Sequence, residues 1–328
     1  SIYDNYFLSE CEVHSICDYL AAPNGTIELH NNAPGCNSQQ EVEEACEALI
    51  HCLPEGIYFS TQEEIDNFQI NYPGCTEIEG GVTISGNDIT SLSGLSVLTS
   101  IAGGLEILNN YTLTSLNGLE GITALHYLLI ANNPDLSDLS GLNNLSSTEG
   151  ALGIWLNESL TSLDGLGNLT SVGGFMEIAM NNSLTSLDGI GNLLSIGGYL
   201  YIYFNSSLIN ISGLENIDAA SVDSLSVTFN PLLSVCNVES ICNYIAAPIG
   251  AIDIHDNAPG CNSPDEVEEA CGFHCLPEGI TFTSQAQIDN FQINYPGCTE
   301  IEGDVIITGI NIINLNGLGS LNAIGDSL

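Results

Sequence analysis

Two groups of six cysteines are the residues best suited to chemistry in this 328-residue chain. The first group lies between Cys11 and Cys75 and the second between Cys236 and Cys298, each within the same local sequence. An even number of cysteines at repeated spacing favours disulfide bonds formed in an oxidising, extracellular setting. A zinc site is the alternative, because His51 precedes Cys52 and His274 precedes Cys275. The stretch before this histidine shortens by two residues in the second group, which a zinc site would tolerate poorly.

Acidic and histidine side chains are the other groups that could do chemistry. A catalytic site needs a nucleophile, a base and an electrostatic stabiliser that converge in one cleft. The pairs Glu43-Glu44 and Glu63-Glu64 are typical of solvated helix faces, and His30 and His255 recur with the duplicated sequence around them. No aspartate spacing matches a calcium loop. We expect no enzyme, no catalytic residue and no bound cofactor, and diffuse binding of divalent cations such as calcium stays open.

The charge composition excludes two classes of partner. The chain has no lysine or arginine against 41 aspartates and glutamates, so its formal net charge is −41. Nucleic acids and anionic membranes are held by clusters of basic residues, so we expect neither as a partner. Hydrophobic residues make up 44% and charged residues 12%, which provides for a buried core, and no run approaches the roughly 18 apolar residues of a membrane span.

A long repeat organises the chain into modules. The segment from Cys11 to Cys36 returns from Cys236 to Cys261, a shift of 225 residues. We interpret residues 1–52 as the last coil and Cys-rich cap of one module, and residues 276–328 as the start of another. The complete module lies between them, with a helical lead-in over 53–80, coils over 81–235 and a Cys-rich cap over 236–275. This order suggests an array that continues beyond both ends.

A short repeat of 23 or 24 residues lies inside the module. It is marked by the glycines of a motif with Leu or Ile two residues before the glycine and Leu or Ile directly after it; these are Gly94, Gly118, Gly141, Gly165, Gly189 and Gly213. Seven segments of period-two alternation accompany these glycines, and they predict one β-strand per coil and parallel strands about 4.8 Å apart. The residues expected to point into a continuous core include Leu152, Ile154, Leu200, Ile202 and Phe204. The asparagines that close these strands are expected to stack as a buried ladder: Asn87, Asn110, Asn133, Asn157, Asn181, Asn205 and Asn230.

The spacing of the cysteines matches the coil length. Cys11 and Cys36 are 25 residues apart and Cys52 and Cys75 are 23 apart, so each pair can occupy equivalent positions on adjacent coils. We expect the pairs Cys11–Cys36, Cys17–Cys46 and Cys52–Cys75, repeated as Cys236–Cys261, Cys242–Cys271 and Cys275–Cys298. Helix signals cover residues 15–22, 38–46 and 61–68 around these cysteines.

The segment Cys75-Thr-Glu-Ile-Glu-Gly80 leads into the first alternating strand and recurs from Cys298 to Gly303. Together with the short repeat, it resembles the leucine-rich repeat and, more closely, the receptor L domain. The resemblance implies a mainly β fold with short helices, built as a right-handed parallel β-solenoid of disulfide-stapled tandem modules. The cap sequences SIC(D/N)Y(L/I)AAP and EVEEAC are also similar to tandem-repeat surface proteins of gliding and marine Bacteroidota. Those proteins are adhesins and filaments exported by the type 9 secretion route.

Aromatic residues gather at the strand positions that face away from the core. Alternation turns Tyr127, Leu129, Trp155, Phe175, Tyr199, Tyr201 and Tyr203 outward on successive coils. Tyrosine and tryptophan are enriched at interfaces, so this stripe is a candidate contact for another copy of the chain or for a sugar. Coverage by a neighbouring loop is the structural alternative.

These observations predict a structural segment of an extracellular fibre, filament or stalk that serves in attachment, including contact with a surface, a cell or prey. Its partners would be other copies of itself, stacked end to end or bundled side by side. The net charge opposes bundling unless salt shortens the Debye length from about 10 Å at 0.1 M to about 3 Å at 1 M. The alternative is an adhesin module that binds a glycan or protein on another cell through the aromatic face.

Eight N-x-S/T sequons occur in the chain. Four coincide with expected ladder positions, namely Asn110, Asn157, Asn181 and Asn205, where burial would exclude a glycan. We expect Asn24, Asn144 and Asn168 to be the better acceptors because they fall in predicted loops.

Overall fold

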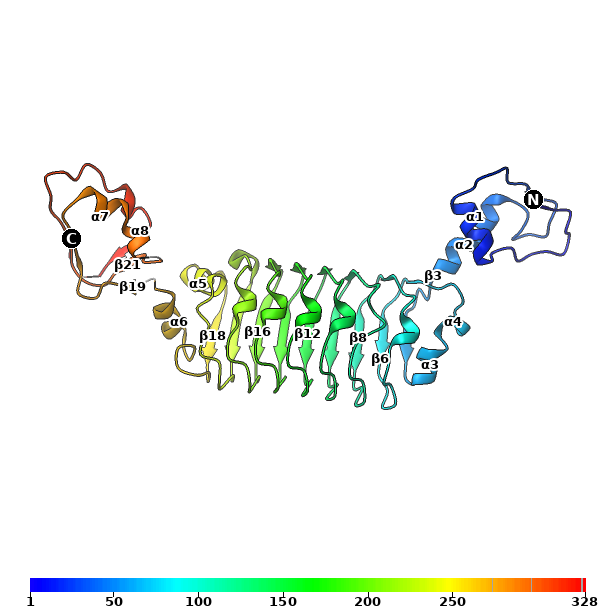
Figure 1. Ribbon diagram of the computed structural model, residues 1–328, viewed down its shortest axis with the longest axis horizontal. Helices are drawn as coiled ribbons and strands as arrows, with labels where there is room; N and C mark the ends of the chain where they lie inside the picture. The colour runs from blue at the N-terminus through cyan, green and yellow to red at the C-terminus, as the bar shows by residue number, and fades with distance from the viewer. Residues whose placement is uncertain (273, 296, 326) are drawn as a thin grey trace. The chain divides into compact units, whose positions relative to one another are not determined.

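The computed structural model describes residues 1–272, 274–295, 297–325 and 327–328, without the side chains of residues 14, 18, 47–51 and 274. The described chain divides into two compact units, Ser1–Gly174 and Phe175–Leu328. Each unit is described by itself below. Both contain parallel strands that lie side by side with short helices at their flanks (Figure 1).

The fold is mainly β, and its main sheet has nine strands, all parallel. In the first unit the order is β12-β10-β8-β6-β4, and in the second it is β18-β17-β16-β14. The first-unit strands are β4 (Ile57–Phe59), β6 (Val82–Ile84), β8 (Leu105–Leu108), β10 (Leu128–Ala131) and β12 (Leu152–Trp155). The second-unit strands are β14 (Met176–Ala179), β16 (Tyr199–Tyr203), β17 (Ser224–Thr228) and β18 (Ile252–His255).

Shorter strands accompany the main sheet. In the first unit they are β1 (Ile2–Tyr3), β2 (Leu29–His30), β3 (His51–Cys52), β5 (Glu77–Ile78), β7 (Ser100–Ile101), β9 (Ala124–Leu125), β11 (Ser147–Thr148) and β13 (Ser171–Val172). In the second they are β15 (Ser195–Ile196), β19 (His274–Cys275), β20 (Ile280–Phe282), β21 (Glu300–Ile301), β22 (Val305–Ile307) and β23 (Ala323–Ile324). Within the first unit β11 pairs with both β9 and β13, so each coil there carries a second, shorter strand.

The α-helices are short and lie in the Cys-rich and lead-in segments. They are α1 (His14–Ala21), α2 (Gln39–Ile50), α3 (Gln62–Asp66), α4 (Phe68–Asn71), α5 (Glu239–Ala246), α6 (Pro264–Cys271), α7 (Gln285–Asp289) and α8 (Phe291–Asn294). Single 3₁₀ turns occupy Ser93–Leu95, Ser140–Leu142, Asp164–Leu166, Asp188–Ile190, Ser212–Leu214, Ala219–Ser221 and Asn316–Leu318. The helix expected over residues 61–68 starts as predicted, because Thr61 and Glu64 form a capping box, but it divides into α3 and α4.

The register of the strands explains the repeat length. Leu105, Leu128 and Leu152 are opposite one another in adjacent strands, so one strand-to-strand step takes one coil of chain. These leucines and their period-two partners are fully buried, for example Ile130 and Ile154. The alternation in the sequence therefore separates a continuous apolar core from an outward face, as expected for half-buried strands.

The repeated glycine is required by the close approach of neighbouring coils. A Cβ on Gly141 would overlap the carbonyl oxygen of Leu116, and one on Gly213 would overlap that of Leu187. Each oxygen belongs to the preceding coil, one repeat earlier. A side chain at this corner would push the two coils apart, so the glycine sets their spacing.

All twelve cysteines are paired, with Cα atoms 5.5–5.7 Å apart in every pair. The pairs are Cys11–Cys36, Cys17–Cys46, Cys52–Cys75, Cys236–Cys261, Cys242–Cys271 and Cys275–Cys298. These are the partners expected from the coil length. Because thiols stay reduced in most cytosols, six disulfides indicate an oxidising environment.

Candidate functional site

The ladder of asparagines is the most regular polar feature of the interior. Asn205 is fully buried, and its Nδ2 donates hydrogen bonds to the carbonyl oxygens of Ile178 (2.9 Å) and Tyr203 (3.2 Å). Its Oδ1 accepts from the backbone N–H of Asn181 at 3.0 Å. The backbone N–H of Asn205 in turn donates to Oδ1 of Asn230 at 3.0 Å. One amide side chain thus satisfies backbone groups of its own coil and of the preceding one.

The first unit repeats this arrangement with Asn110, Asn133 and Asn157. The backbone N–H and Nδ2 of Asn110 both donate to Oδ1 of Asn133, at 3.0 Å each. Nδ2 of Asn133 reaches the carbonyl oxygen of Ile107 at 2.9 Å. All three asparagines are fully buried. Since buried backbone groups without partners are costly, the ladder holds the corner of each coil in place.

Asn87 is a correction to the expected ladder, because it is exposed. Asn109, ahead of Asn110, has a positive φ of 57°, whereas no such residue occurs at the end of β6. The turn is therefore reached earlier, and the backbone N–H of Gly86 makes the ladder bond to Oδ1 of Asn110 at 2.9 Å. The alignment of strands in the sequence does not reveal whether this left-handed residue is present.

The ladder also includes two asparagines that the sequence analysis missed. Nδ2 of Asn257 donates to the carbonyl oxygens of Val227 (2.7 Å) and Cys261 (2.9 Å), and its Oδ1 accepts from the backbone N–H of Asn230 at 2.9 Å. Asn32 has the same role in the first cap, with bonds to Ile2 and Cys36. Their shared N-A-P-G-C sequence was the available signal.

The sequons expected to accept glycans are partly engaged in hydrogen bonds. Asn144 and Asn168 are exposed, but Nδ2 of Asn144 donates to the carbonyl oxygen of Glu120 at 2.8 Å. Nδ2 of Asn168 donates to that of Asn143 at 2.6 Å. They form an outer row of asparagines that ties each coil to the preceding one. Because a glycan is attached through Nδ2, only Asn24 of the three remains an exposed acceptor without such a bond in the described structure.

In the first unit the outward face carries Tyr127, Leu129 and Trp155, all half-buried. The ring of Tyr127 covers Gly104, since a Cβ there would overlap the ring, and its hydroxyl donates to Oε1 of Glu106 at 3.0 Å. The indole of Trp155 covers Gly153 in the same way. These rings lie against the sheet and fill space above glycines.

In the second unit the outward face carries Phe175, Tyr199, Tyr201 and Tyr203, also half-buried. Phe175 and Tyr199 are stacked with ring centroids 4.7 Å apart, and Tyr199 and Tyr201 are stacked at 4.3 Å. The hydroxyl of Tyr203 donates to the Glu177 carboxylate. The expected outward direction agrees with this arrangement, but the ring faces are largely in contact with one another.

Burial and the nearby carboxylates change how these tyrosines ionise. Partial burial, together with the Glu177 carboxylate, raises the pKa of Tyr203 to about 12. The pKa of Tyr199 is raised by burial and by the charge of Glu177, and that of Tyr127 by burial and by Glu106. The three phenols therefore stay protonated over the ordinary pH range, and those of Tyr127 and Tyr203 donate hydrogen bonds to Glu106 and Glu177.

A second set of aromatic residues lies at the ends of β16 and β17. Phe204 and Phe229 are 45% and 40% exposed, and their rings stack with centroids 4.6 Å apart. Phe229 also contacts His255 edge to face at 5.2 Å. The imidazole lies 3.3 Å from Asp253 and 2.8 Å from Asp256. We refer to Phe204, Phe229, His255, Asp253 and Asp256 as the strand-end patch. The expectation that Phe204 points into the core is wrong, because its backbone has a positive φ of 57° and its side chain lies at the surface.

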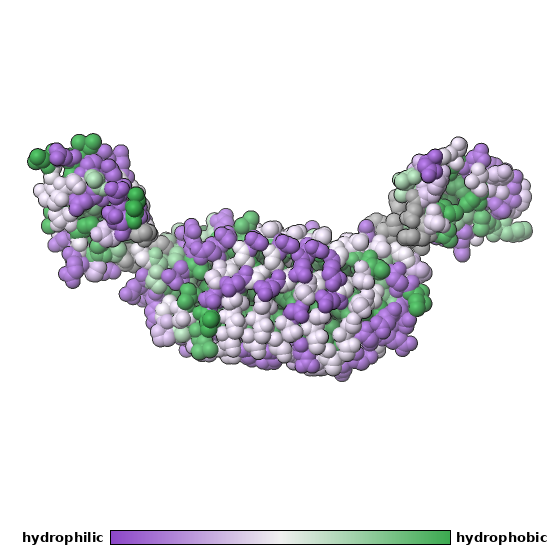
Figure 2. Space-filling model, in the orientation of Figure 1, coloured by the Kyte–Doolittle hydropathy of each residue, from purple (hydrophilic) through white to green (hydrophobic). Residues whose placement is uncertain are grey.

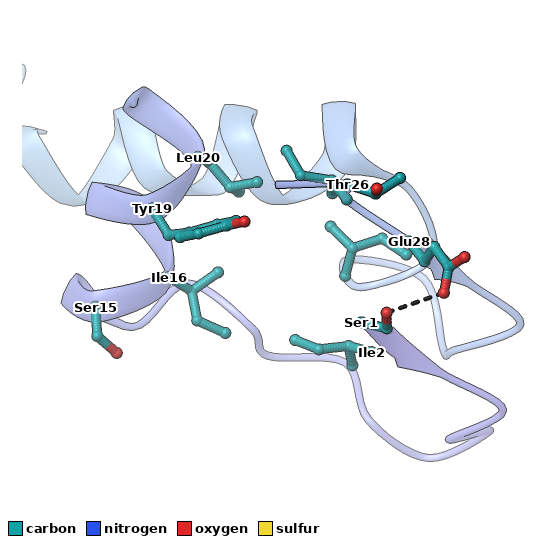
Figure 3. A pocket seen from close by; sticks show the side chains of 10 residues that line it. Ser1, Ile2, Ser15, Ile16, Tyr19, Leu20, Thr26 and Glu28 are labelled. Atoms are coloured by element: carbon teal, nitrogen blue, oxygen red, sulfur yellow. Dashed lines mark hydrogen bonds between the residues drawn. The ribbon is translucent and has the colours of Figure 1, made fainter. Parts of the chain in front are cut away.

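The first cap contains a pocket of about 310 Å³ between α1 and β2, lined by Ile2, Ile16, Tyr19 and Leu29 among others. Figure 3 shows Tyr19, Ile16 and Leu20 directed from the helix towards Ile2 and Thr26. In the second cap the equivalent Tyr244 is buried and its hydroxyl donates to the carbonyl oxygen of Asp223 at 3.1 Å. A preceding coil thus fills there the space that forms the pocket in the first cap.

Two negative findings concern other kinds of site. Among the side chains that the structure describes, no three His, Cys, Asp or Glu residues form a group that could hold a metal ion. The side chains of His51 and His274, considered as zinc ligands, lie outside that description, whereas Cys52 and Cys275 are in disulfides. No helix among the described residues is long and apolar enough to cross a membrane.

No family model, no curated protein and no solved structure matches this chain.

Proposed function

We propose that this chain is a structural segment of an extracellular fibre, filament or stalk used for attachment. Its coils would form a solenoid of the leucine-rich repeat kind, most like a receptor L domain, and its modules would resemble those of type 9-secreted adhesins. The observation that carries the proposal is the asparagine ladder, in which each coil completes the hydrogen bonding of the one before it. A coil of this kind is stable only against its neighbours, so a chain of such coils grows along one axis.

The disulfides support a mechanical role. Cys52–Cys75 joins the strand that ends the first cap to the lead-in of the following coils, and Cys275–Cys298 does the same at the end of the second cap. The linker Leu53-Pro-Glu-Gly56, which directly follows the first cap, is short. A covalent bond across each such junction limits bending between modules, which suits a stalk that must transmit force.

Self-association through the aromatic face would then bundle neighbouring chains. Because the net charge is −41, bundling needs salt or divalent cations to screen repulsion. The test is electron microscopy of the native material in high salt, repeated after chelation and after dilution. We expect rods with an axial repeat of about 45–50 Å, from nine or ten coils at about 4.8 Å each. Separate single particles under every condition would overturn the proposal.

The second candidate is an adhesin module that binds a glycan or protein on another cell. The exposed phenylalanines of the strand-end patch favour it, because contiguous exposed apolar surface marks contact sites. An adhesin module would stay monomeric at any concentration and bind only in the presence of its target. Sedimentation over a range of protein concentrations separates the two candidates.

A further inference from the structure

The residue before each ladder asparagine, from Asn32 and Asn110 to Asn257, takes a left-handed backbone conformation, and so does Asp4 at the matching position of the first cap; φ lies between 54° and 61° in this row. Most residues in this row are of types that tolerate it, namely Asp4, Asn31, Asn109, Asn132 and Asp256. Leu156, Met180, Phe204 and Phe229 occupy the same position with bulky apolar side chains. Such residues rarely adopt this conformation, so the backbone does not account for them.

The hydrophobic core does not account for them either. Phe204 and Phe229 are exposed, and the residue equivalent to Phe229 in the other cap is the polar Asp4, whose carboxylate accepts from Asn31 at 2.9 Å. The fold therefore accepts a polar side chain at this position. Figure 2 shows hydrophobic side chains gathered on the surface over the ends of the strands beside β18. Two stacked phenylalanine rings are thus exposed to solvent at positions whose left-handed backbone conformation favours asparagine.

The charges around the patch decide which occupant it fits. Asp253 and Asp256 flank His255 and remain largely exposed, and the hydroxyl of Tyr203 holds Glu177 on the other side of Phe204. Because Phe229 contacts His255 and both aspartates lie against that imidazole, a partner that covers Phe229 comes close to Asp253 and Asp256. Burying a carboxylate without a cation is strongly unfavourable. A second copy of this chain has no lysine or arginine to offer.

We propose that the strand-end patch is a docking surface for a protein segment that presents arginine or lysine beside an apolar side chain. The apolar side chain packs on Phe204 and Phe229, and the cation pairs with Asp253 and Asp256. A guanidinium can at the same time lie over an exposed phenylalanine ring, which adds a cation–π interaction. All of these residues belong to one unit, so the inference does not depend on fibre formation.

The test uses the full chain and the double variant Phe204→Asn, Phe229→Asn. Asparagine suits the left-handed conformation, as at Asn109 and Asn132, so the variant keeps the fold and every charge. Leu156→Asn is the matched control, since Leu156 has the same conformation and is exposed but belongs to the other unit. The probe is a fluorescein-labelled peptide of alternating arginine and leucine, followed by fluorescence anisotropy at about 0.15 M salt.

We expect the double variant to bind the peptide at least tenfold more weakly than the wild-type chain and Leu156→Asn to bind like wild type. Asp253→Asn with Asp256→Asn should weaken binding similarly, and the melting temperature of the phenylalanine variant should not fall. Equal binding by the wild type and the phenylalanine variant would show attraction to net charge alone and overturn the proposal. Failure of the peptide to bind wild type would do the same. Loss of dimers, or loss of glycan binding, in this variant without loss of peptide binding would assign the patch to a second copy or to a sugar instead.

Discussion

The asparagine ladder makes a quantitative prediction for Asn205→Ala. The truncation removes the donor to the carbonyl oxygen of Ile178 and the acceptor for the backbone N–H of Asn181. Both partners lie at a buried corner, and each unsatisfied group costs about 1–3 kcal/mol. We therefore expect the free energy of unfolding of the surrounding coils to fall by about 2–6 kcal/mol.

Two measurements are suited to this change. Stacked repeats unfold locally, so hydrogen exchange at the amide of Asn181 reports the corner directly, and urea unfolding reports the whole chain. A loss of 2 kcal/mol corresponds to exchange that is faster by a factor of about 25.

Asn216→Ala is the control, because Asn216 is exposed and donates one bond, from Nδ2 to the carbonyl oxygen of Gly191 at 2.8 Å. Its loss should cost about 1 kcal/mol or less, since water replaces the partner. If Asn205→Ala were no more destabilising than Asn216→Ala, the ladder would not hold the coils together.

Three further outcomes follow from the disulfides, the tyrosines and the sequons. Replacing Cys236 and Cys261 together by alanine opens a 25-residue loop and should lower the free energy of unfolding by about 3.5 kcal/mol in a chain-entropy model. Thermal unfolding measures this change, and an unchanged midpoint would contradict it. Spectrophotometric titration should find Tyr203 ionising at about pH 12. Because the pKa of this phenol is higher in the folded chain than in the unfolded chain, the stability of the fold should decline as the pH rises from about 10 towards 12. Glu177→Gln should lower that pKa, and an identical titration curve would refute the role of the carboxylate. Expression in a glycosylating cell should place glycans on Asn24 and none on Asn110, Asn157, Asn181 or Asn205, as read by peptide mass spectrometry, and a modified ladder asparagine would count against its burial.

The sequence predicted the strands well because their alternation has a simple physical cause. Leu128 and Ile130 are fully buried in the core, whereas Leu129 between them is only half-buried, and a period of two expresses this directly. The sequence showed that a glycine recurs in each coil but not why it is required. At Gly141 a side chain would collide with the backbone of the preceding coil. Contacts between residues one repeat apart become visible only once the register is known.

The parts that escaped prediction depend on single dihedral angles and on rotamers. Asn87 occupies an aligned position but is exposed, because the turn before it lacks the left-handed residue that Asn109 provides in the next coil. Phe204 was wrongly expected to point into the core, because period-two alternation was continued past Ile202, whereas a positive φ of 57° at Phe204 ends the alternation there. For Tyr199 and Tyr201 the sequence correctly indicated that the side chains point outward. It did not indicate that their rings stack on each other, because stacking depends on the rotamers of neighbouring side chains.

The absence of lysine and arginine links the inside of the molecule to its partners. Apart from the amino terminus, only six histidines could carry a positive charge, so hydrogen bonds, apolar contacts and disulfides must hold the coils together. Salt acts weakly on those forces and strongly on repulsion between separate chains. A change in salt concentration should therefore alter the association of chains far more than the melting of one chain. Binding of a cationic partner depends on salt in the opposite way. Salt weakens the attraction between that partner and this acidic chain, whereas salt promotes the bundling of chains. The sign of the salt effect thus separates self-assembly from binding at the strand-end patch.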